Sequence, residues 1–396
     1  MIGVQFGAGN IGRGFLAHLF WESGLETIFV EAREDLVKEL NNRGWYPLRL
    51  LKKDGSSVDL RIDRIKAFLP FQREEIFQAI SSAEIISTAV GARNLSAIAP
   101  LLAGGLAERY RSNGKEINIL CCENLKNAPQ LLRDLVLENL ENENEKGFVK
   151  ERVSFVGTVI ARMVPVVDVR FGVDDPLFLV AENYYRLPYE AKAVKGEMPR
   201  LVGVVPVENF AAEMDRKLFI HNLGHAVLAY WGYLKGYSYI HQAIKDQEIA
   251  AILDGAWEEV SKALLQKYPD LDSQEHAELV KDLRERFANP LLMDTVQRVA
   301  RDPLRKLKPQ DRIVGAATLC MSQGIFPRFV ALCLVAALLY DWPEDQEAQK
   351  LQEIIAERGV EAVLREVCEI DPASDFARRV LEEYRKLRER KKEWKR

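Results

Sequence analysis

The chain has 396 residues, which is too long for one ordinary domain and suits two domains that each bury a core. Hydrophobic residues make up 48% and charged residues 29%, a composition typical of globular proteins rather than of disordered or fibrous ones. The net charge of −4 gives no electrostatic reason to expect a nucleic-acid partner. The locally basic stretch 385–396 is interpreted as a solvated helix end.

The cysteines and the apolar segments predict where the protein works. The five cysteines include no CxxC pair, which argues against a disulfide framework. Met1 runs directly into a strand-like segment, so no secretory leader is expected. The apolar segment 329–340 is shorter than the ~20 residues of a membrane span and predicts a buried helix. We therefore expect a cytoplasmic protein that does not attach to membranes.

The two halves of the chain have different patterns. Five short apolar runs in the first half alternate with helical segments, at residues 2–6, 26–31, 83–90, 117–123 and 153–160. This alternation predicts an α/β fold with a parallel, doubly wound sheet. After about residue 195, apolar residues recur at helical spacing. We predict a nucleotide-binding-type domain over 1–195 and a mostly α-helical domain over 196–396.

One segment interrupts the alternation between the second and third runs. In residues 48–62, apolar and charged side chains alternate after an Asp54-Gly55 turn. A period of two around such a turn is typical of a β-hairpin. We therefore predict an inserted hairpin.

A glycine-rich motif follows the first strand and opens a helix. The motif reads Gly7-Ala8-Gly9-Asn10-Ile11-Gly12. In a GxGxxG turn the first glycine permits the tight turn, the second lets the backbone approach a pyrophosphate, and the third allows close packing of helix on strand. The unpaired N–H groups at the helix start then face the anion. This context predicts a dinucleotide-binding domain of the Rossmann type.

Glu31 indicates which dinucleotide is bound. It closes the second predicted strand, 19 residues after Gly12, where a carboxylate accepts hydrogen bonds from the adenosine ribose. A carboxylate there would repel a 2′-phosphate, which favours NAD over NADP, although Arg33 could weaken this preference.

A second motif lies at the start of the helical half. On a regular helix, Lys217, Asn222 and His225 fall within an arc of roughly 140°. Alcohol oxidation needs a base for the hydroxyl proton and a donor for the developing oxyanion. A desolvated lysine has its pKa lowered toward neutrality and can act as that base, Asn222 can donate, and His225 can orient the lysine.

The two motifs together resemble the polyol-specific long-chain dehydrogenase/reductase family. The resemblance rests on the glycine motif continued through Arg13-Gly14-Phe15 and on the KxxxxNxxH set. Further segments resemble the branch of this family that acts on polyol phosphates, and the likeness runs from residue 1 to about 370. These segments are Thr88-Ala89-Val90-Gly91, Cys122-Glu123-Asn124, Ala161-Arg162-Met163-Val164-Pro165 and Arg301-Asp302-Pro303-Leu304-Arg305-Lys306-Leu307.

The resemblance implies an NAD-dependent enzyme without a metal that interconverts D-mannitol 1-phosphate and D-fructose 6-phosphate. It implies that Lys217 is the general acid/base and that Asn222 and Asn124 form the oxyanion hole. His225 would lie beside the lysine, and Glu123 would relay or gate the proton. Thr88 and Val90 would join Glu31 and the glycine motif in binding the cofactor, in a monomer or homodimer.

The substrate phosphate needs its own receptor. Arg301, Arg305 and Lys306 are the local candidates, because guanidinium groups suit phosphate oxygens. The alternative is that this segment is a helix-ending turn with internal ion pairs. Asp168 is a candidate for binding a polyol hydroxyl.

Other functions remain open from the sequence. The protein could instead be a member of the same family that acts on an unphosphorylated polyol or a hexuronate, or a redox sensor that binds NAD(H) without turnover. His221 and His225 have the spacing of half a zinc site, but the glutamate of HExxH is absent, so no metal is expected. Cys121 and Cys122 end an apolar strand and are predicted to pack as small hydrophobic residues.

Overall fold

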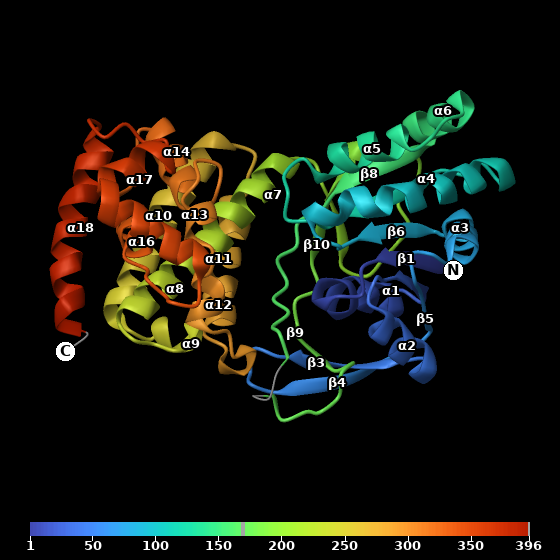
Figure 1. The fold of residues 1–396 in the computed structure, drawn as a ribbon, viewed down its shortest axis with the longest axis horizontal. Coiled ribbons are helices and arrows are strands. Elements are labelled where there is room, and N and C mark those ends of the chain that lie inside the picture. The colour runs from blue at the N-terminus through green and yellow to red at the C-terminus, as the bar shows by residue number, and fades with distance from the viewer. Residues whose placement is uncertain (168–170, 395–396) are drawn as a thin grey trace. The chain divides into compact units, whose positions relative to one another are not determined.

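The computed structural model describes residues 1–167 and 171–394. The chain divides into two compact units, Met1–Glu213 and Met214–Arg396, of which the first carries a parallel sheet and the second is helical (Figure 1). The expected boundary at 195/196 falls earlier than this division. Strand β11 (Val204–Val207) pairs in parallel with β10 (Leu187–Glu190), which keeps the residues after 196 with the first unit.

The sheet of the first unit has six parallel strands in the order β5-β2-β1-β6-β7-β8. The strands are β1 (Ile2–Phe6), β2 (Glu26–Val30), β5 (Ile65–Phe68), β6 (Ile85–Thr88), β7 (Ile117–Cys121) and β8 (Val153–Gly157). This order is that of a doubly wound dinucleotide-binding sheet, so the predicted fold class is confirmed. From β1 the strands are added toward one edge of the sheet as far as β5, and from β6 they are added toward the other edge. Ligands of such sheets bind at the carboxyl ends of the strands at this switch point, between β1 and β6.

Helices cover both faces of this sheet, which explains why the strands read as continuous apolar runs. Val4 and Ile119 pack with the helices on one face, and Ile85 and Leu120 pack with Phe15 on the other. The helices of the first face are α3 (Arg73–Ser82), α4 (Leu95–Ser112), α5 (Ala128–Glu138) and α6 (Glu143–Arg152). The other face carries η1 (Gly12–Leu16), α1 (Ala17–Glu22) and α2 (Glu34–Arg43). Short 3₁₀ turns are η2 (Ala92–Asn94) and η4 (Ala191–Ala193).

The predicted hairpin is confirmed. Strands β3 (Tyr46–Leu51) and β4 (Ser57–Ile62) pair antiparallel around a turn in which Gly55 has a φ of 83°. The Asp54 carboxylate accepts the N–H of Ser56 at 2.9 Å and so closes the turn. Strand β9 (Leu179–Glu182) adds to β3 in parallel, a pairing that the sequence did not indicate.

The second unit is a helical bundle, as predicted. Helix α8 (Leu223–Leu234) is buried along nearly its whole length, and Tyr230 donates its hydroxyl to the carbonyl of Ala300 at 2.9 Å. The apolar segment around 329–340 forms α15 (Arg328–Leu338), a buried helix. Helix α7 (Phe210–Arg216) crosses from the first unit into the second. The remaining helices are η5 (Lys217–Asn222), α9 (Ile240–Ala243), α10 (Gln247–Lys267), α11 (Ser273–Phe287), η6 (Pro290–Leu292), α12 (Val296–Ala300), α13 (Pro303–Lys306), α14 (Val314–Ser322), α16 (Gln346–Arg358), α17 (Val360–Glu366) and α18 (Asp375–Trp394).

The basic end of the chain is attached to the bundle as far as it is described. On α18, Lys391 pairs with Asp341 at 2.8 Å and Arg390 pairs with Glu248 at 2.9 Å. These pairs hold a helix end that we expected to be solvated. Over residues 1–167 and 171–394, no helix has both the length and the apolar character to cross a membrane.

Candidate active site

The glycine motif forms the tight turn that its sequence predicts. Gly7 has a φ of 89°, and a Cβ on Gly12 would lie 2.0 Å from the carbonyl oxygen of Gly7. A Cβ on Gly9, in contrast, would meet no described atom within 4 Å. Gly12 is therefore needed for packing, whereas Gly9 leaves open space where a bound group can approach the backbone. Asn10 and Ile11 begin the helix, and no side chain caps the start of its π-helical turn η1.

Arg13 stabilises the glycine turn through hydrogen bonds of its side chain. Its side chain is buried, and its Nε donates to the carbonyl of Ala8 at 2.7 Å while Nη1 donates to Leu177 at 3.0 Å. Tyr46 on the hairpin strand donates its hydroxyl to the Arg13 carbonyl at 2.6 Å. In the sequence, Arg13 was identified only as part of the glycine motif. An arginine inside an otherwise apolar helix was the signal for this structural role.

Glu31 is fixed at the carboxyl end of β2. Its Oε2 accepts the N–H of Ala8 at 2.7 Å, and its Oε1 accepts the N–H of Arg33 at 3.1 Å. Arg33 Nε also donates to Oε1 at 3.4 Å, and because a carboxylate has about four acceptor positions, capacity remains on Oε2 for a ligand hydroxyl. Glu31 thus both stabilises the glycine turn and retains the capacity to bind a ribose.

Glu123 joins the ends of β6 and β7. Its Oε2 accepts the hydroxyl of Thr88 at 2.8 Å, and its Oε1 accepts the N–H of Val90 at 3.2 Å. Burial raises the pKa of the Glu123 carboxyl, although these two hydrogen bonds oppose the shift. A Cβ on Gly7 would lie 3.2 Å from the Val90 side chain, so this group adjoins the glycine turn. Asn124 follows Glu123 and is exposed.

The Lys217 helix differs from the expected regular helix. Residues Lys217–Asn222 form a π-helix, η5, which continues directly into α8. A π-helix has about 4.4 residues per turn, so the arc that contains Lys217, Asn222 and His225 narrows from roughly 140° to roughly 60°. On this geometry the three side chains share a narrower face than a regular helix would give them.

Lys217 and Asn222 have the properties that the expected chemistry needs. Lys217 is partly buried, and desolvation followed by the positive charge of Arg312 lowers its pKa to about 8. Asn222 is buried, and its Nδ2 donor has no hydrogen-bond partner among the described residues. An unpaired buried donor costs free energy unless a ligand accepts from it.

His225 has a carboxylate partner. Its Nε2 lies 3.3 Å from Oδ2 of Asp294, within ion-pair distance but without the direction of a good hydrogen bond. Its ring stacks on Phe287 with the ring centroids 4.3 Å apart. Burial lowers the pKa of His225 below its usual value despite Asp294, and burial with nearby Arg286 lowers that of His221 further. Both imidazoles are therefore neutral at physiological pH.

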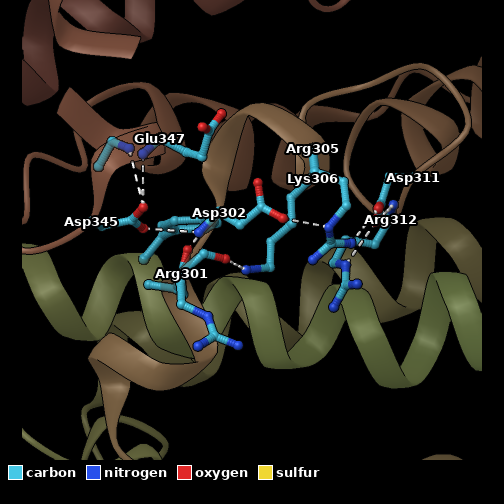
Figure 2. Close-up of polar contacts among 11 residues, drawn as sticks. Arg301, Asp302, Arg305, Lys306, Asp311, Arg312, Asp345 and Glu347 are labelled. Atoms are coloured by element: carbon cyan, nitrogen blue, oxygen red, sulfur yellow. Dashed lines mark hydrogen bonds and ion pairs between the residues drawn. The ribbon is translucent and has the colours of Figure 1, made fainter. Parts of the chain in front are cut away.

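The predicted phosphate-binding residues lie on and around α13. Arg305 is paired with Asp302 at 2.6 Å and with Asp311 at 2.9 Å, and Lys306 donates to the carbonyl of Arg301 (Figure 2). These contacts match the alternative prediction, in which the segment is a helix-ending turn with internal ion pairs. Arg301 is exposed, and in Figure 2 its guanidinium points away from Asp302, with no partner among the described residues. Asp168 lies outside the described residues.

Asp345 holds this segment in place. Its Oδ2 accepts the N–H of Asp302 at 2.8 Å, while its Oδ1 caps α16 by accepting the N–H groups of Glu347 and Ala348 (Figure 2). Asp302 has a φ of 64°, which an L-residue adopts only with strain. The bond from Asp345 helps to hold this conformation.

Comparisons with known proteins place the chain in a family. The model of the mannitol dehydrogenase Rossmann domain matches residues 1–203, and that of the mannitol dehydrogenase C-terminal domain matches residues 208–388. The chain belongs to the mannitol dehydrogenase family. It is 34% identical to a mannitol-1-phosphate 5-dehydrogenase of Caldanaerobacter subterraneus, over 97% of this chain and 98% of that protein. It is 36% identical to a mannitol-1-phosphate 5-dehydrogenase of Thermoanaerobacter pseudethanolicus, over 98% of each chain.

Solved structures show the same fold at lower identity. A substrate-free D-sorbitol dehydrogenase superposes with a TM-score of 0.80 at 18% identity, covering 98% of this chain and 93% of its own. The mannitol 2-dehydrogenase of Pseudomonas fluorescens, in a ternary complex with NAD and D-mannitol, gives a TM-score of 0.74 at 19% identity, covering 98% and 92%. At these identities the likeness establishes the fold of this family member.

Two residues of this family member that the sequence reading missed are Asp294 and Arg312. Asp294 precedes α12 and reaches His225, and Arg312 precedes α14 and acts on Lys217. Neither belongs to a short motif, because each meets its partner only through tertiary packing. No local pattern in the sequence signals either contact.

Proposed function

We propose that the protein is an NAD-dependent dehydrogenase that interconverts D-mannitol 1-phosphate and D-fructose 6-phosphate. Relatives named mannitol-1-phosphate 5-dehydrogenase match it at 34% and 36% identity over nearly the full length of both chains. The observation that carries the chemistry is the buried Asn222 amide donor, which has no hydrogen-bond partner in the described part of the chain. It lies on the same short π-helix as Lys217, whose pKa is lowered to about 8.

The residues of the glycine turn fit a dinucleotide. Gly9 leaves space at the helix start, and Glu31 keeps acceptor capacity at the end of β2. These residues would hold the pyrophosphate and the adenosine ribose respectively. NAD, when bound, supplies the hydride acceptor for oxidation and, as NADH, the donor for reduction.

The residues of the second unit would handle the proton and the oxygen. In the oxidation direction, neutral Lys217 takes the proton of the substrate hydroxyl, and in reduction its ammonium form returns one to the same oxygen. Asn222 donates through Nδ2 to that oxygen as negative charge develops on it. His225, oriented by Asp294, lies on the same face and holds the lysine in place.

A spectrophotometric assay tests this proposal. Purified protein, NADH and D-fructose 6-phosphate are mixed, and the loss of NADH absorbance is followed, with D-fructose and a hexuronate as parallel substrates. We expect rapid oxidation of NADH only with the phosphorylated sugar. Faster reduction of D-fructose or of the hexuronate would instead favour the other family activities. NADH binding without turnover of any of the three would indicate a sensor.

A further inference from the structure

The segment from Asp302 to Arg312 holds more positive than negative charge in a partly buried place. Arg305 pairs with Asp302 and Asp311, and the Nε of Arg312 donates to the same Asp311 carboxylate at 2.8 Å. Figure 2 shows Arg305 and Arg312 converging on this carboxylate. Lys306 is only 4% exposed and donates to a neutral carbonyl. Two guanidinium groups and the Lys306 amine therefore face two carboxylates.

This charged segment adjoins the Lys217 helix. Gly315, in the first turn of α14, packs so tightly against Phe219 that a Cβ would lie 2.9 Å from the ring. Phe219 is two residues after Lys217 on η5. Among the charges that act on Lys217 and on Lys306, Arg312 has the largest effect, and it lowers both pKa values. Lys217 is thus exposed to the charges of Arg312, Arg305 and Asp311 in this segment.

A partly buried cluster in which basic side chains outnumber carboxylates is costly unless an anion compensates the positive charge. The Arg312 side chain is 11% exposed, and a guanidinium suits phosphate oxygens because its N–H groups form a planar fork. We propose that Arg312 anchors the phosphate group of the substrate, with Arg305 and Lys306 beside it, and that this phosphate completes the charge balance around Lys217. The inference rests on the proposed function and puts Arg312 in the place of Arg301 among the predicted phosphate contacts.

A phosphate bound at Arg312 would change the pKa of Lys217. The charged groups that act on Lys217 are Arg312, Arg305 and Asp311, and the one histidine on its own π-helix is His221, which is neutral. A phosphate dianion on Arg312 offsets the positive charge that disfavours the ammonium form of Lys217. The pKa of Lys217 is therefore higher in the substrate complex than in the free enzyme. Because kcat/KM follows free enzyme and kcat follows the complex, the two pH profiles of oxidation should separate.

Arg312→Gln and the matched variant Lys308→Gln test the assignment. Lys308 is an exposed lysine in the same segment, so its variant removes one positive charge without touching the proposed contact. We expect Arg312→Gln to raise the KM for D-fructose 6-phosphate by roughly 10- to 100-fold, because the variant loses a charged hydrogen bond to the phosphate. Lys308→Gln should leave this KM unchanged. Inorganic phosphate should compete with the substrate in the wild type and not in Arg312→Gln.

Further variants keep the test decisive. If Arg312→Gln fails to fold, Arg312→Lys retains the charge without the planar fork and should still raise KM, with a smaller effect on phosphate competition. A wild-type KM in Arg312→Gln, or a KM increase in Arg301→Gln alone, would overturn the assignment. Either result leaves the proposed function intact, because that proposal fails only if the wild-type protein does not reduce D-fructose 6-phosphate.

Discussion

The Nε2 atom of His225 lies 3.3 Å from Oδ2 of Asp294, and Asp294 pairs in turn with Arg298 at 2.5 Å. Burial alone would raise the pKa of the Asp294 carboxyl, but His225 and Arg298 outweigh burial and hold it below its usual value. A charged carboxylate at this distance from a neutral imidazole favours one orientation of the ring. Asp294 is thus a positioning residue for His225.

Asp294→Asn should lower kcat by roughly 10- to 100-fold, because the amide keeps the volume but loses the charge that orients His225. NADH binding should be unchanged. Steady-state kinetics with D-fructose 6-phosphate, together with a thermal melt, measure the effect. Asp254→Asn, which removes an exposed carboxylate paired with Arg284, is the matched control and should leave kcat unaltered. Equal kcat values in the two variants would exclude the positioning role.

Gly9 and Gly12 provide a paired test of the cofactor turn. Gly12→Ala should lower the free energy of unfolding by about 1–3 kcal/mol or more, because its Cβ meets the Gly7 carbonyl. Gly9→Ala should leave stability within about 0.5 kcal/mol but weaken NADH binding, because its Cβ fills the space that the pyrophosphate needs. Urea unfolding and NADH fluorescence titration separate the two effects. Undiminished NADH affinity in Gly9→Ala would place the dinucleotide elsewhere.

Glu31 should set the preference for NAD over NADP. Glu31→Ser removes the carboxylate that repels a 2′-phosphate and releases Arg33, which now pairs with it at 3.4 Å. The ratio of kcat/KM for NADH to that for NADPH should fall by at least about tenfold. Because Ala8 also loses its acceptor, the variant should lose about 1 kcal/mol of stability. An unchanged cofactor ratio would contradict the role of Glu31.

The sequence predicted the sheet because its cues were local. Continuous apolar runs, the glycine turn after β1 and the Asp54-Gly55 turn each lie within a few residues of one another. Strand β5 (Ile65–Phe68) was missed, because its four residues follow the hairpin without a separate turn signal. The π-helix at Lys217 was missed because apolar periodicity does not distinguish a widened turn from a regular one.

The candidate site was predictable only in part, for the same reason. Lys217, Asn222 and His225 could be proposed from the sequence because they lie within nine consecutive residues and match a family pattern. Asp294 and Arg312 meet that helix from segments about 70 to 95 residues later in the chain, and only the tertiary fold brings them there. The pairing of Arg305 with Asp302 and Asp311 was open as an alternative, and the structure shows it.

The pH dependence of the reaction follows from Lys217. Its pKa is lowered to about 8, so the neutral amine that oxidation needs predominates above this pH and the ammonium form that reduction needs predominates below it. The kcat/KM for oxidation of D-mannitol 1-phosphate should rise with pH to a plateau above about 8, and that for reduction should fall over the same range. Initial rates measured at constant ionic strength test both directions. A flat profile through pH 8 in both directions would remove Lys217 from the proton transfer.

Lys217→Ala gives the most direct test of the central claim, that this lysine is the general acid/base of a polyol-phosphate dehydrogenase. The measurement is NADH oxidation driven by D-fructose 6-phosphate, with NADH affinity determined by fluorescence on the same preparation. Turnover should fall by roughly 10²- to 10⁴-fold while NADH binds as tightly as it does to the wild type. Turnover within tenfold of the wild type would contradict the account.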